Sequence, residues 1–335
     1  MTSELMTSTN ETGFPWLLAD IGGSNARFGL KLSKDAEITH IKTIPVVQHA
    51  TPVKAAQTYL DQISVTMGAD FQPPRKAAFA VATAVVGDQV AFTNSHWSFS
   101  RAKVQEELEL SSFLVLNDFE ALALSLPRLN ASQLRAHKDL PTACGTLAVI
   151  GPGTGLGVAG VTQTKLGWIA LPCEGGHATL APTNNFESAV LDQVRQIYPH
   201  VSAERLLSGI GLPVLHAAIA TLRGAPSTIL TAELIVERGL DRSDAICSET
   251  LDTFCALLGN FAGNVALILG ARGGVYIGGG IVPRLGERFF NSRFRECFEA
   301  KGRLDNYLKQ IPTVLISDTL AALTGAAFAI EQQGA

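Results

Sequence analysis

The sequence predicts an α/β fold built from two similar halves, and three observations lead to this prediction. A β-hairpin with a glycine-rich bend at Gly22 opens the chain, and the same pattern returns at Gly153, 131 positions later. Near the end, a short apolar strand runs into three consecutive glycines, Gly278 to Gly280. Strands and amphipathic helices alternate between these points, which is typical of α/β layers. We therefore expect duplicated halves that face one another.

Length and composition agree with a large, well-buried core. The 335 residues suggest two domains, 47% of them are hydrophobic, and the 31 glycines bring the apolar share to about 56%. Charged residues make up only 17%, and the formal net charge is −4. This balance offers no basic surface for nucleic acid or an anionic membrane. We expect a soluble protein without a nucleic-acid or membrane partner.

The first hairpin is the earliest element whose residues could bind a ligand or a metal. Residues 16–21 form an apolar strand that carries Asp20, residues 22–25 form the turn Gly-Gly-Ser-Asn, and residues 27–32 alternate with period two. A dinucleotide fingerprint requires a strand-to-helix step, so this is not one. Asp20 precedes the turn and is placed to hold Mg²⁺, directly or through water.

The second hairpin repeats the pattern with strands over 146–150 and 156–161 around the turn 151–155. Glycine turns let main-chain N–H groups approach an anion closely, so the turns 22–24 and 153–155 together could hold the terminal phosphates of a nucleotide. The Walker sequence is absent, because no Gly-Lys pair occurs. Ordinary tight turns with chance similarity remain the alternative.

The elements between the hairpins follow from hydrophobic periodicity. We expect strands over 77–82, 113–116 and 274–277, and a helix over 187–198 with apolar residues at 190, 191, 194, 197 and 198. Pro283 is expected at the first position of a helix. The uncharged stretch 254–271 approaches membrane-helix length, but it contains Asn260, Asn264 and several glycines. A buried core helix is the better interpretation.

Asn117 and Asp118 follow an apolar strand and open a helix over 119–126 that Pro127 closes. The carboxyl edge of a strand is where α/β proteins place ligands, so Asp118 could accept the proton of a hydroxyl that attacks a phosphoryl group. A capping box between Asn117 and Glu120 would explain the same residues without a ligand.

Two further segments carry polar groups in glycine-rich surroundings. Glu174 and His177 flank two glycines in a loop and could direct hydrogen bonds at one polyhydroxyl ligand; a structural role for the histidine is the alternative. As a metal pair they lack a third ligand, which argues against zinc. Glu204 lies where we expect an apolar helix to open, and its charge would favour the helix dipole with no ligand at all.

The five cysteines include no C-x₂₋₄-C pair, so a zinc site is not expected, and their odd number fits reduced thiols in a cytosol. The polar start, residues 1–13, lacks the apolar core of a signal peptide and is expected to be a disordered tail.

Taken together, these segments resemble the bacterial-type glucokinases of the hexokinase, actin and Hsp70-like superfamily. The matching stretches are Ala19-Asp20-Ile21-Gly22-Gly23-Ser24-Asn25-Ala26-Arg27, Leu116 to Phe119, Gly151 to Gly157, Leu171 to His177, His200 to Gly209, Gly273 to Leu285 and Lys301-Gly302-Arg303. Their order and spacing cover nearly the whole chain, from about residue 15 to 327.

The resemblance implies a duplicated ribonuclease H-like (actin/hexokinase-like ATPase) fold, with two α/β domains around a central cleft. The small domain would comprise 14–128 and about 318–335, and the large domain 129–317. It also implies transfer of the γ-phosphoryl group of ATP to O6 of glucose with Mg²⁺, which feeds glycolysis. The protein would be a cytoplasmic homodimer.

The resemblance assigns roles residue by residue. Asp118 would be the general base. Glucose hydroxyls would be bound by Asn117, Asp118, Glu174, His177 and Glu204. ATP would be bound by Ala19, Asp20, Ile21, Gly22, Gly23, Ser24, Gly153, Thr154, Gly155, Gly278, Gly279 and Gly280, with Asp20 also serving Mg²⁺.

Departures from the family pattern are small. Ala19 and Ser24 stand where Gly and Thr are frequent, and Cys173 stands where Gly or Val is common. The zinc-binding cysteine cluster of the repressor-type sugar kinases is missing. Two alternatives stay open: an ATP-dependent kinase of another hexose, and a non-catalytic sugar-sensing protein.

Overall fold

The computed structural model describes residues 13–92, 94–226 and 229–333. The expected tail therefore lies, apart from Gly13, outside the described residues. The chain divides into two compact units, the first from the described residues of Met1–Ser125 and Leu320–Ala335, the second from Leu126–Thr319. The expected domain limits near residues 128 and 318 stay a prediction.

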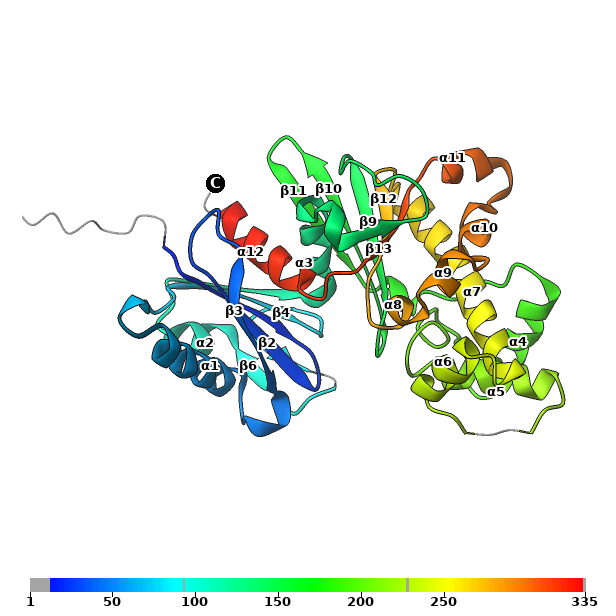
Figure 1. Ribbon diagram of the computed structural model, residues 1–335, viewed down its shortest axis with the longest axis horizontal. Helices are drawn as coiled ribbons and strands as arrows, with labels where there is room; N and C mark the ends of the chain where they lie inside the picture. Colours follow the sequence, from blue (N-terminus) through cyan, green and yellow to red (C-terminus); the bar gives the residue numbers. More distant parts are fainter. Residues whose placement is uncertain (1–12, 93, 227–228, 334–335) are drawn as a thin grey trace, which may run out of the picture. The chain divides into compact units, whose positions relative to one another are not determined.

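The first unit is built on a mixed five-stranded sheet (Figure 1). The strand order is β3-β2-β1-β4-β7; β1 pairs antiparallel with β2 and parallel with β4, and β4 pairs parallel with β7. The bounds are β1 (Trp16–Ile21), β2 (Asn25–Lys31), β3 (Ile38–Pro45), β4 (Lys76–Val81) and β7 (Ser112–Asn117), with a separate ribbon of β5 (Gln89–Ala91) and β6 (Ser98–Ser100).

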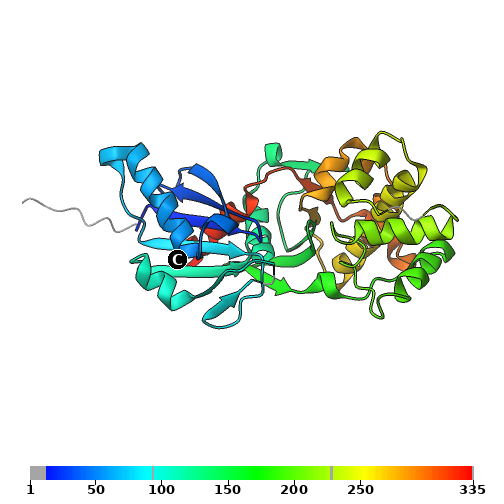
Figure 2. The same ribbon diagram turned by 90° about the horizontal axis from the view of Figure 1, so that it is seen from below.

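The two faces of this sheet are covered by different helices: α1 (Pro52–Met67), α2 (Arg101–Glu107), α3 (Asp118–Ser125) and α12 (Ala321–Gln333). Because side chains alternate along a strand, Leu17 and Ile21 of β1 join the core cluster that contains Tyr59 of α1. Leu18 faces the other way and packs with Leu323 of α12. Figures 1 and 2 show the light-blue α1 beside the dark-blue strands, and Figure 1 shows α12 next to α3.

Helices α3 and α12 approach closely through a small residue. A Cβ atom at Gly325 would lie 1.6 Å from the carbonyl oxygen of Ala121, which no side chain tolerates. Glycine at this position therefore brings the C-terminal helix against the helix that begins at Asp118.

The second unit repeats the sheet. Its strand order is β11-β10-β9-β12-β13-β8, with β9-β10-β11 antiparallel and β9-β12-β13 parallel. The bounds are β8 (Leu134–Ala136), β9 (Thr146–Pro152), β10 (Leu156–Thr164), β11 (Gly167–Cys173), β12 (Gly274–Ile277) and β13 (Thr313–Ile316). The first five strands reproduce the order and directions of β3-β2-β1-β4-β7, which confirms the predicted duplication.

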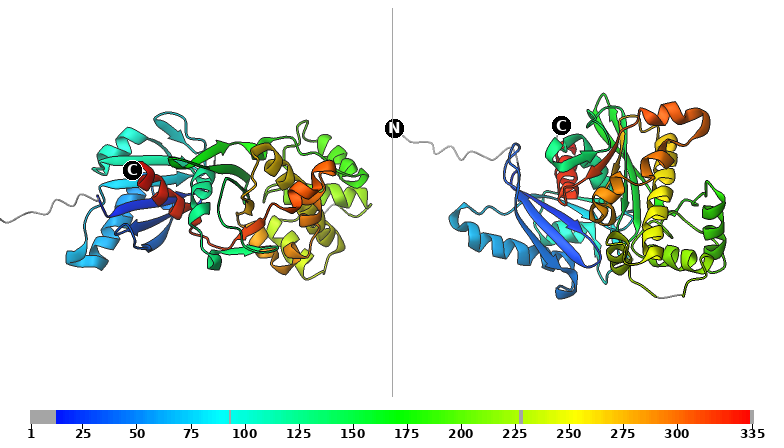
Figure 3. Two further views of the ribbon diagram at one scale, coloured as in Figure 1. Left: turned by 90° about the horizontal axis from the view of Figure 1, so that it is seen from above. Right: turned by 45° about the vertical axis from the view of Figure 1, so that its right-hand side comes forward.

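A helical part follows this sheet, coloured from light green to orange in Figure 2. It comprises α4 (Asn185–Arg195), α5 (Leu212–Leu222), α6 (Ala232–Leu240), α7 (Ala245–Leu269), α8 (Ile281–Leu285), α9 (Glu287–Phe290), α10 (Phe294–Glu299) and α11 (Asp305–Lys309). Figure 3 shows the long yellow α7 beside the green strands of the same unit. Buried residues of α7 such as Phe254 and Leu258 join Ile150 of β9 in one core.

Among the described residues, α7 is the one helix long and apolar enough to span a membrane by length and composition. Its apolar window is 78% buried inside the protein. The expectation of a core helix is therefore confirmed.

Several element limits differ from the predictions. Helix α4 begins at Asn185, with Asn184 as N-cap accepting from the Glu187 amide. It ends at Arg195, and Ile197 is 71% exposed; helices usually end before the residue that precedes a proline, here Pro199. Pro283 lies at the third position of α8, not the first, which is allowed because the first-turn N–H groups lack intrahelical partners.

Candidate active site

The predicted catalytic and metal-binding carboxylates of the first unit lie at one edge of its sheet. Strands β1, β4 and β7 are parallel and in register, with Ile21 beside Val81 and Val81 beside Asn117. Asp20 and Asp118 therefore leave the same carboxyl edge, separated by two strand spacings, about 10 Å. Ligands of α/β sheets bind at such edges.

Asp20 has the properties of a cation ligand. Burial raises the pKa of its carboxyl group, and the Arg27 guanidinium, 3.9 Å away, acts in the opposite direction. The side chain keeps 29% exposure, so an ion can reach it. A partly exposed carboxylate of this kind fits Mg²⁺, which takes one or two carboxylates together with phosphate oxygens and water.

The turn after Asp20 offers a ligand mainly main-chain groups. Ala19 and Ile21 are fully buried in the core, so they could meet a ligand only through their main chain. The Gly22 amide donates to Asn25 O at 2.9 Å and closes the turn. A Cβ at Gly23 would lie 2.7 Å from Asn94 O. Glycine therefore lets the turn pack against the segment that contains Asn94.

Asn117 caps helix α3, as the capping interpretation states. Its Oδ1 accepts from the amides of Phe119 and Glu120 at 3.0 and 3.3 Å, and its Nδ2 donates to Thr83 O at 3.2 Å. These bonds fix the end of β7 and the start of α3. One oxygen of Asp118 accepts from the Phe119 amide at 2.9 Å, so its carboxylate is held at the first residue of the helix. A sugar contact by Asn117 stays a prediction.

In the second unit, Glu204 lies directly on the glycine turn 153–155. Its Oε2 accepts from the Leu156 amide at 2.8 Å, and a Cβ at Gly155 would come within 2.5 Å of the same oxygen. The Gly209 amide donates to Gly153 O at 2.7 Å. The segment 204–209 therefore supports the turn from its side.

The loop that carries Glu174 and His177 packs against the same place. The Gly176 carbonyl accepts from the Glu204 amide at 2.8 Å, and a Cβ at Gly176 would lie 1.9 Å from Leu156 O. Residues Gly175–His177 form a single 3₁₀ turn. The side chains of Glu174 and His177 are exposed, and His177 makes no side-chain hydrogen bond to another described residue. This does not fit the alternative of a satisfied structural histidine.

The triple glycine completes this cluster. Strand β12 pairs in parallel with β9 up to Ile277 and Ile150, and the Gly278 amide continues the ladder by donating to Ile150 O at 2.8 Å. Gly279 has a positive φ of 76°, and a Cβ there would lie 2.3 Å from Pro152 O. The predicted ATP and sugar residues of the second unit thus all meet at the carboxyl edge of β9 and β12.

One local prediction is wrong. No helix opens at residues 202–205; the chain runs through turns from 204 to 211 before α5 begins at Leu212. The Gly209 amide donates to Gly153 O and not to a carbonyl one helical turn earlier. Gly211 packs so tightly that a Cβ would lie 2.7 Å from Arg205 O. The helix-dipole explanation of Glu204 is therefore removed.

Sequence reasoning missed three groups that support the site: the Leu156 amide that Glu204 accepts from, the Thr83 carbonyl that orients Asn117, and Gly209. Gly209 stands in the stretch 200–209 that carries the family resemblance, and that was the available signal. The other two act through their main chain, so no side-chain pattern reveals them.

Two α/β units with one strand order, each with a glycine turn and carboxylates at the carboxyl edge of its sheet, define a kinase of the actin-like ATPase fold. A crystal structure of glucokinase from an Antarctic psychrotroph superposes with a TM-score of 0.86 at 35% identity, covering 95% of this chain and 98% of that one.

A family model for glucokinase matches residues 17–333. Glucokinase of Chromobacterium violaceum is 47% identical, covering 94% of this chain and 88% of that protein. Glucokinase of Aromatoleum aromaticum is 46% identical, covering 95% of both. The chain belongs to the glucokinase family, and the predicted family and fold class are confirmed.

Proposed function

We propose that this protein transfers the γ-phosphoryl group of ATP to O6 of glucose. The observation that carries the proposal is the contact between Glu204 and the turn 153–155. A carboxylate suited to sugar hydroxyls lies against a turn suited to phosphate, so acceptor and donor sites are neighbours within one unit. The family relationship supports the same reaction.

Asp118 is proposed as the general base. It orients the 6-hydroxyl and takes its proton as the oxygen attacks the γ-phosphorus in line. The capping bonds of Asn117 and the Phe119 amide hold this carboxylate at the start of α3, so little reorganisation is needed. Preorganised positioning of this kind is a large part of catalysis in phosphoryl transfer.

Main-chain N–H groups and a bound metal ion would together stabilise the negative charge of the transferred phosphoryl group. We propose that main-chain N–H groups of the turns 22–24 and 153–155 donate to phosphate oxygens. Asp20 would hold Mg²⁺, which neutralises charge on the phosphate oxygens when bound. Gly278 to Gly280 would lie near the adenosine, where glycine permits close approach of the main chain.

Sugar selection is assigned to Asn117, Asp118, Glu174, His177 and Glu204. A site built to pair buried hydroxyls rejects analogues that lack them by large factors. Asp118 belongs to the first unit, and Glu174, His177 and Glu204 belong to the second.

The proposal also covers the cellular compartment and the oligomeric state. All five cysteines are free thiols, which supports a reducing, cytoplasmic compartment. A homodimer follows from the family resemblance alone, and sedimentation equilibrium of the purified protein tests it.

A coupled assay tests the function. Purified protein, glucose and MgATP should give glucose-dependent ADP formation, measured through NADH oxidation, which stops when EDTA removes the metal. Mannose and fructose serve as comparison acceptors in this assay, and ADP and polyphosphate are compared as donors by measuring glucose 6-phosphate formation. Tight glucose binding without ADP formation would instead identify a sugar-sensing protein, and faster turnover of another hexose would reassign the substrate.

A further inference from the structure

Three metal-ligating side chains that the proposed reaction does not use meet in the helical part of the second unit. His216 lies on α5, Asp244 is the N-cap residue of α7, and Cys247 lies in the first turn of α7. One ligand atom from each lies within 4.8 Å of the others, and this is the one such group with three members among the described residues.

His216 supplies an independent sign that a ligand is missing. Its side chain is 4% exposed, and its Nε2 is buried without a hydrogen-bond partner. An unsatisfied buried polar atom destabilises a fold unless something binds it. A metal ion coordinated through Nε2 would remove this deficit, since neutral imidazole is a common metal ligand.

The charges of the three groups suit a divalent cation. A Cys247 thiolate and an Asp244 carboxylate carry two negative charges, and neutral His216 carries none. Arg238 and Asp241 also act on Cys247, with opposite signs. One divalent ion therefore balances the cluster.

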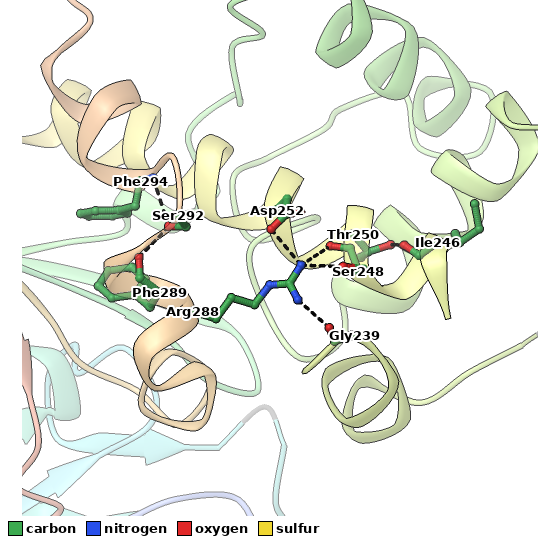
Figure 4. A network of polar contacts seen from close by, with 9 residues as sticks. All are labelled: Gly239, Ile246, Ser248, Thr250, Asp252, Arg288, Phe289, Ser292 and Phe294. Carbon is green, nitrogen blue, oxygen red and sulfur yellow. Dashed lines mark hydrogen bonds and ion pairs between the residues drawn. The ribbon is translucent and has the colours of Figure 1, made fainter. Parts of the chain in front are cut away.

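The neighbouring helices are held firmly, as Figure 4 shows for the adjoining network. Arg288 donates to the carbonyl oxygens of Gly239 and Ser248 at 2.5 and 2.8 Å and pairs with Asp252 at 2.9 Å. A Cβ at Gly239 would lie 2.9 Å from Cys247 O. The end of α6 and the start of α7 are thus fixed beside the cluster.

We propose that His216, Asp244 and Cys247 form a metal site for Zn²⁺ or a similar borderline-soft divalent cation, which ties the middle of α5 to the start of α7. The ligand types are those zinc prefers, and water would complete a four-coordinate site. Tetrahedral bonding places ligand atoms roughly 3.5 Å apart, so side-chain movements of about 1 Å suffice. Coordination replaces the thiol proton, which passes to the buffer, by the S–metal bond.

Cobalt(II) titration of the reduced, chelator-stripped full-length protein tests the site. One equivalent should give a thiolate-to-cobalt charge-transfer band in the near ultraviolet together with visible bands typical of four-coordinate Co²⁺. Zn²⁺ should then bleach these bands, and saturating Zn²⁺ should raise Tm on the order of 5 °C.

The variants locate the binding. Cys247→Ser and His216→Gln should lose the charge-transfer band and the Tm shift, whereas Cys255→Ser, a matched change at another buried cysteine of α7, should keep both. Replacing the exposed Cys144 and Cys173 by serine should also keep them. Absence of the band in the wild-type protein, or its persistence in Cys247→Ser, would overturn the proposal, and the first outcome holds even if a variant fails to fold.

Discussion

Glu204 offers the sharpest test of how the second unit is organised, because one carboxylate is assigned two tasks. It accepts from the Leu156 amide beside the phosphate turn, and it is proposed to bind a sugar hydroxyl. Glu204→Ala should therefore weaken both substrates. His177→Ala, a change at an exposed side chain, should weaken glucose binding alone.

The magnitude follows from the bond that is removed. A hydrogen bond to a charged acceptor contributes about 1.5–3 kcal/mol, and its loss here leaves the amide of Leu156, a residue 5% exposed, without its partner. This corresponds to a rise in KM for ATP of roughly 10-fold or more. A lost sugar bond of similar strength should lower kcat/KM for glucose, measured at saturating ATP, by roughly 10- to 10²-fold. Glu204→Gln keeps an acceptor oxygen and should recover about half of the effect in free energy.

Steady-state kinetics in the coupled assay, with each substrate varied at saturation of the other, separates these terms. Thermal unfolding confirms that each variant is folded. If Glu204→Ala raised KM for glucose but left KM for ATP at the wild-type value, the supporting role of Glu204 at the turn would be refuted.

Two further predictions concern glycine and charge. Gly153 has open space around its Cβ position, whereas a Cβ at Gly176 would clash with Leu156 O. Gly153→Ala should therefore change the free energy of unfolding by less than about 0.5 kcal/mol while it raises KM for ATP. Gly176→Ala should destabilise the protein by about 2–3 kcal/mol. Equal Tm losses in denaturation scans would contradict this. Burial raises the pKa of Asp20 above 3.8 in the folded state, so its contribution to stability is present below pH 3.8 and lost as pH rises through the folded pKa. Asp20→Asn should therefore raise Tm at pH 7, and this gain should vanish toward pH 3.8, while MgATP-dependent turnover is abolished. A lower Tm at pH 7 would show that the Arg27 pair dominates.

The sheets were predictable because their signals are local. Period-two alternation and glycine turns specify the hairpins at Gly22 and Gly153, and an apolar run before Gly278 specifies a buried parallel strand. The repeat of these turns led to the duplication that the strand orders confirm. Helix limits were less certain, since α4 stops short of Ile197 and α8 begins before Pro283.

Features that depend on distant main-chain groups could not be read from the sequence. The stretch at Glu204 has the composition of a helix start, but the Gly209 amide donates its hydrogen bond to the distant Gly153 O. The His216, Asp244 and Cys247 cluster lies on two helices that only tertiary packing brings together, so cysteine spacing gave no sign of it. Family resemblance supplied the roles of Asp118 and Glu174, which local patterns left open.

The most direct test of the account is Asp118→Asn, measured for turnover and for glucose binding on one preparation. Asparagine retains an oxygen that can accept from the Phe119 amide, as Asp118 does at 2.9 Å, so α3 should start unchanged. We predict that kcat falls by about 10²- to 10⁴-fold, while the Kd for glucose by calorimetry stays within about 10-fold of wild type. Turnover within a few-fold of the wild-type protein would contradict the assignment of Asp118 as the base.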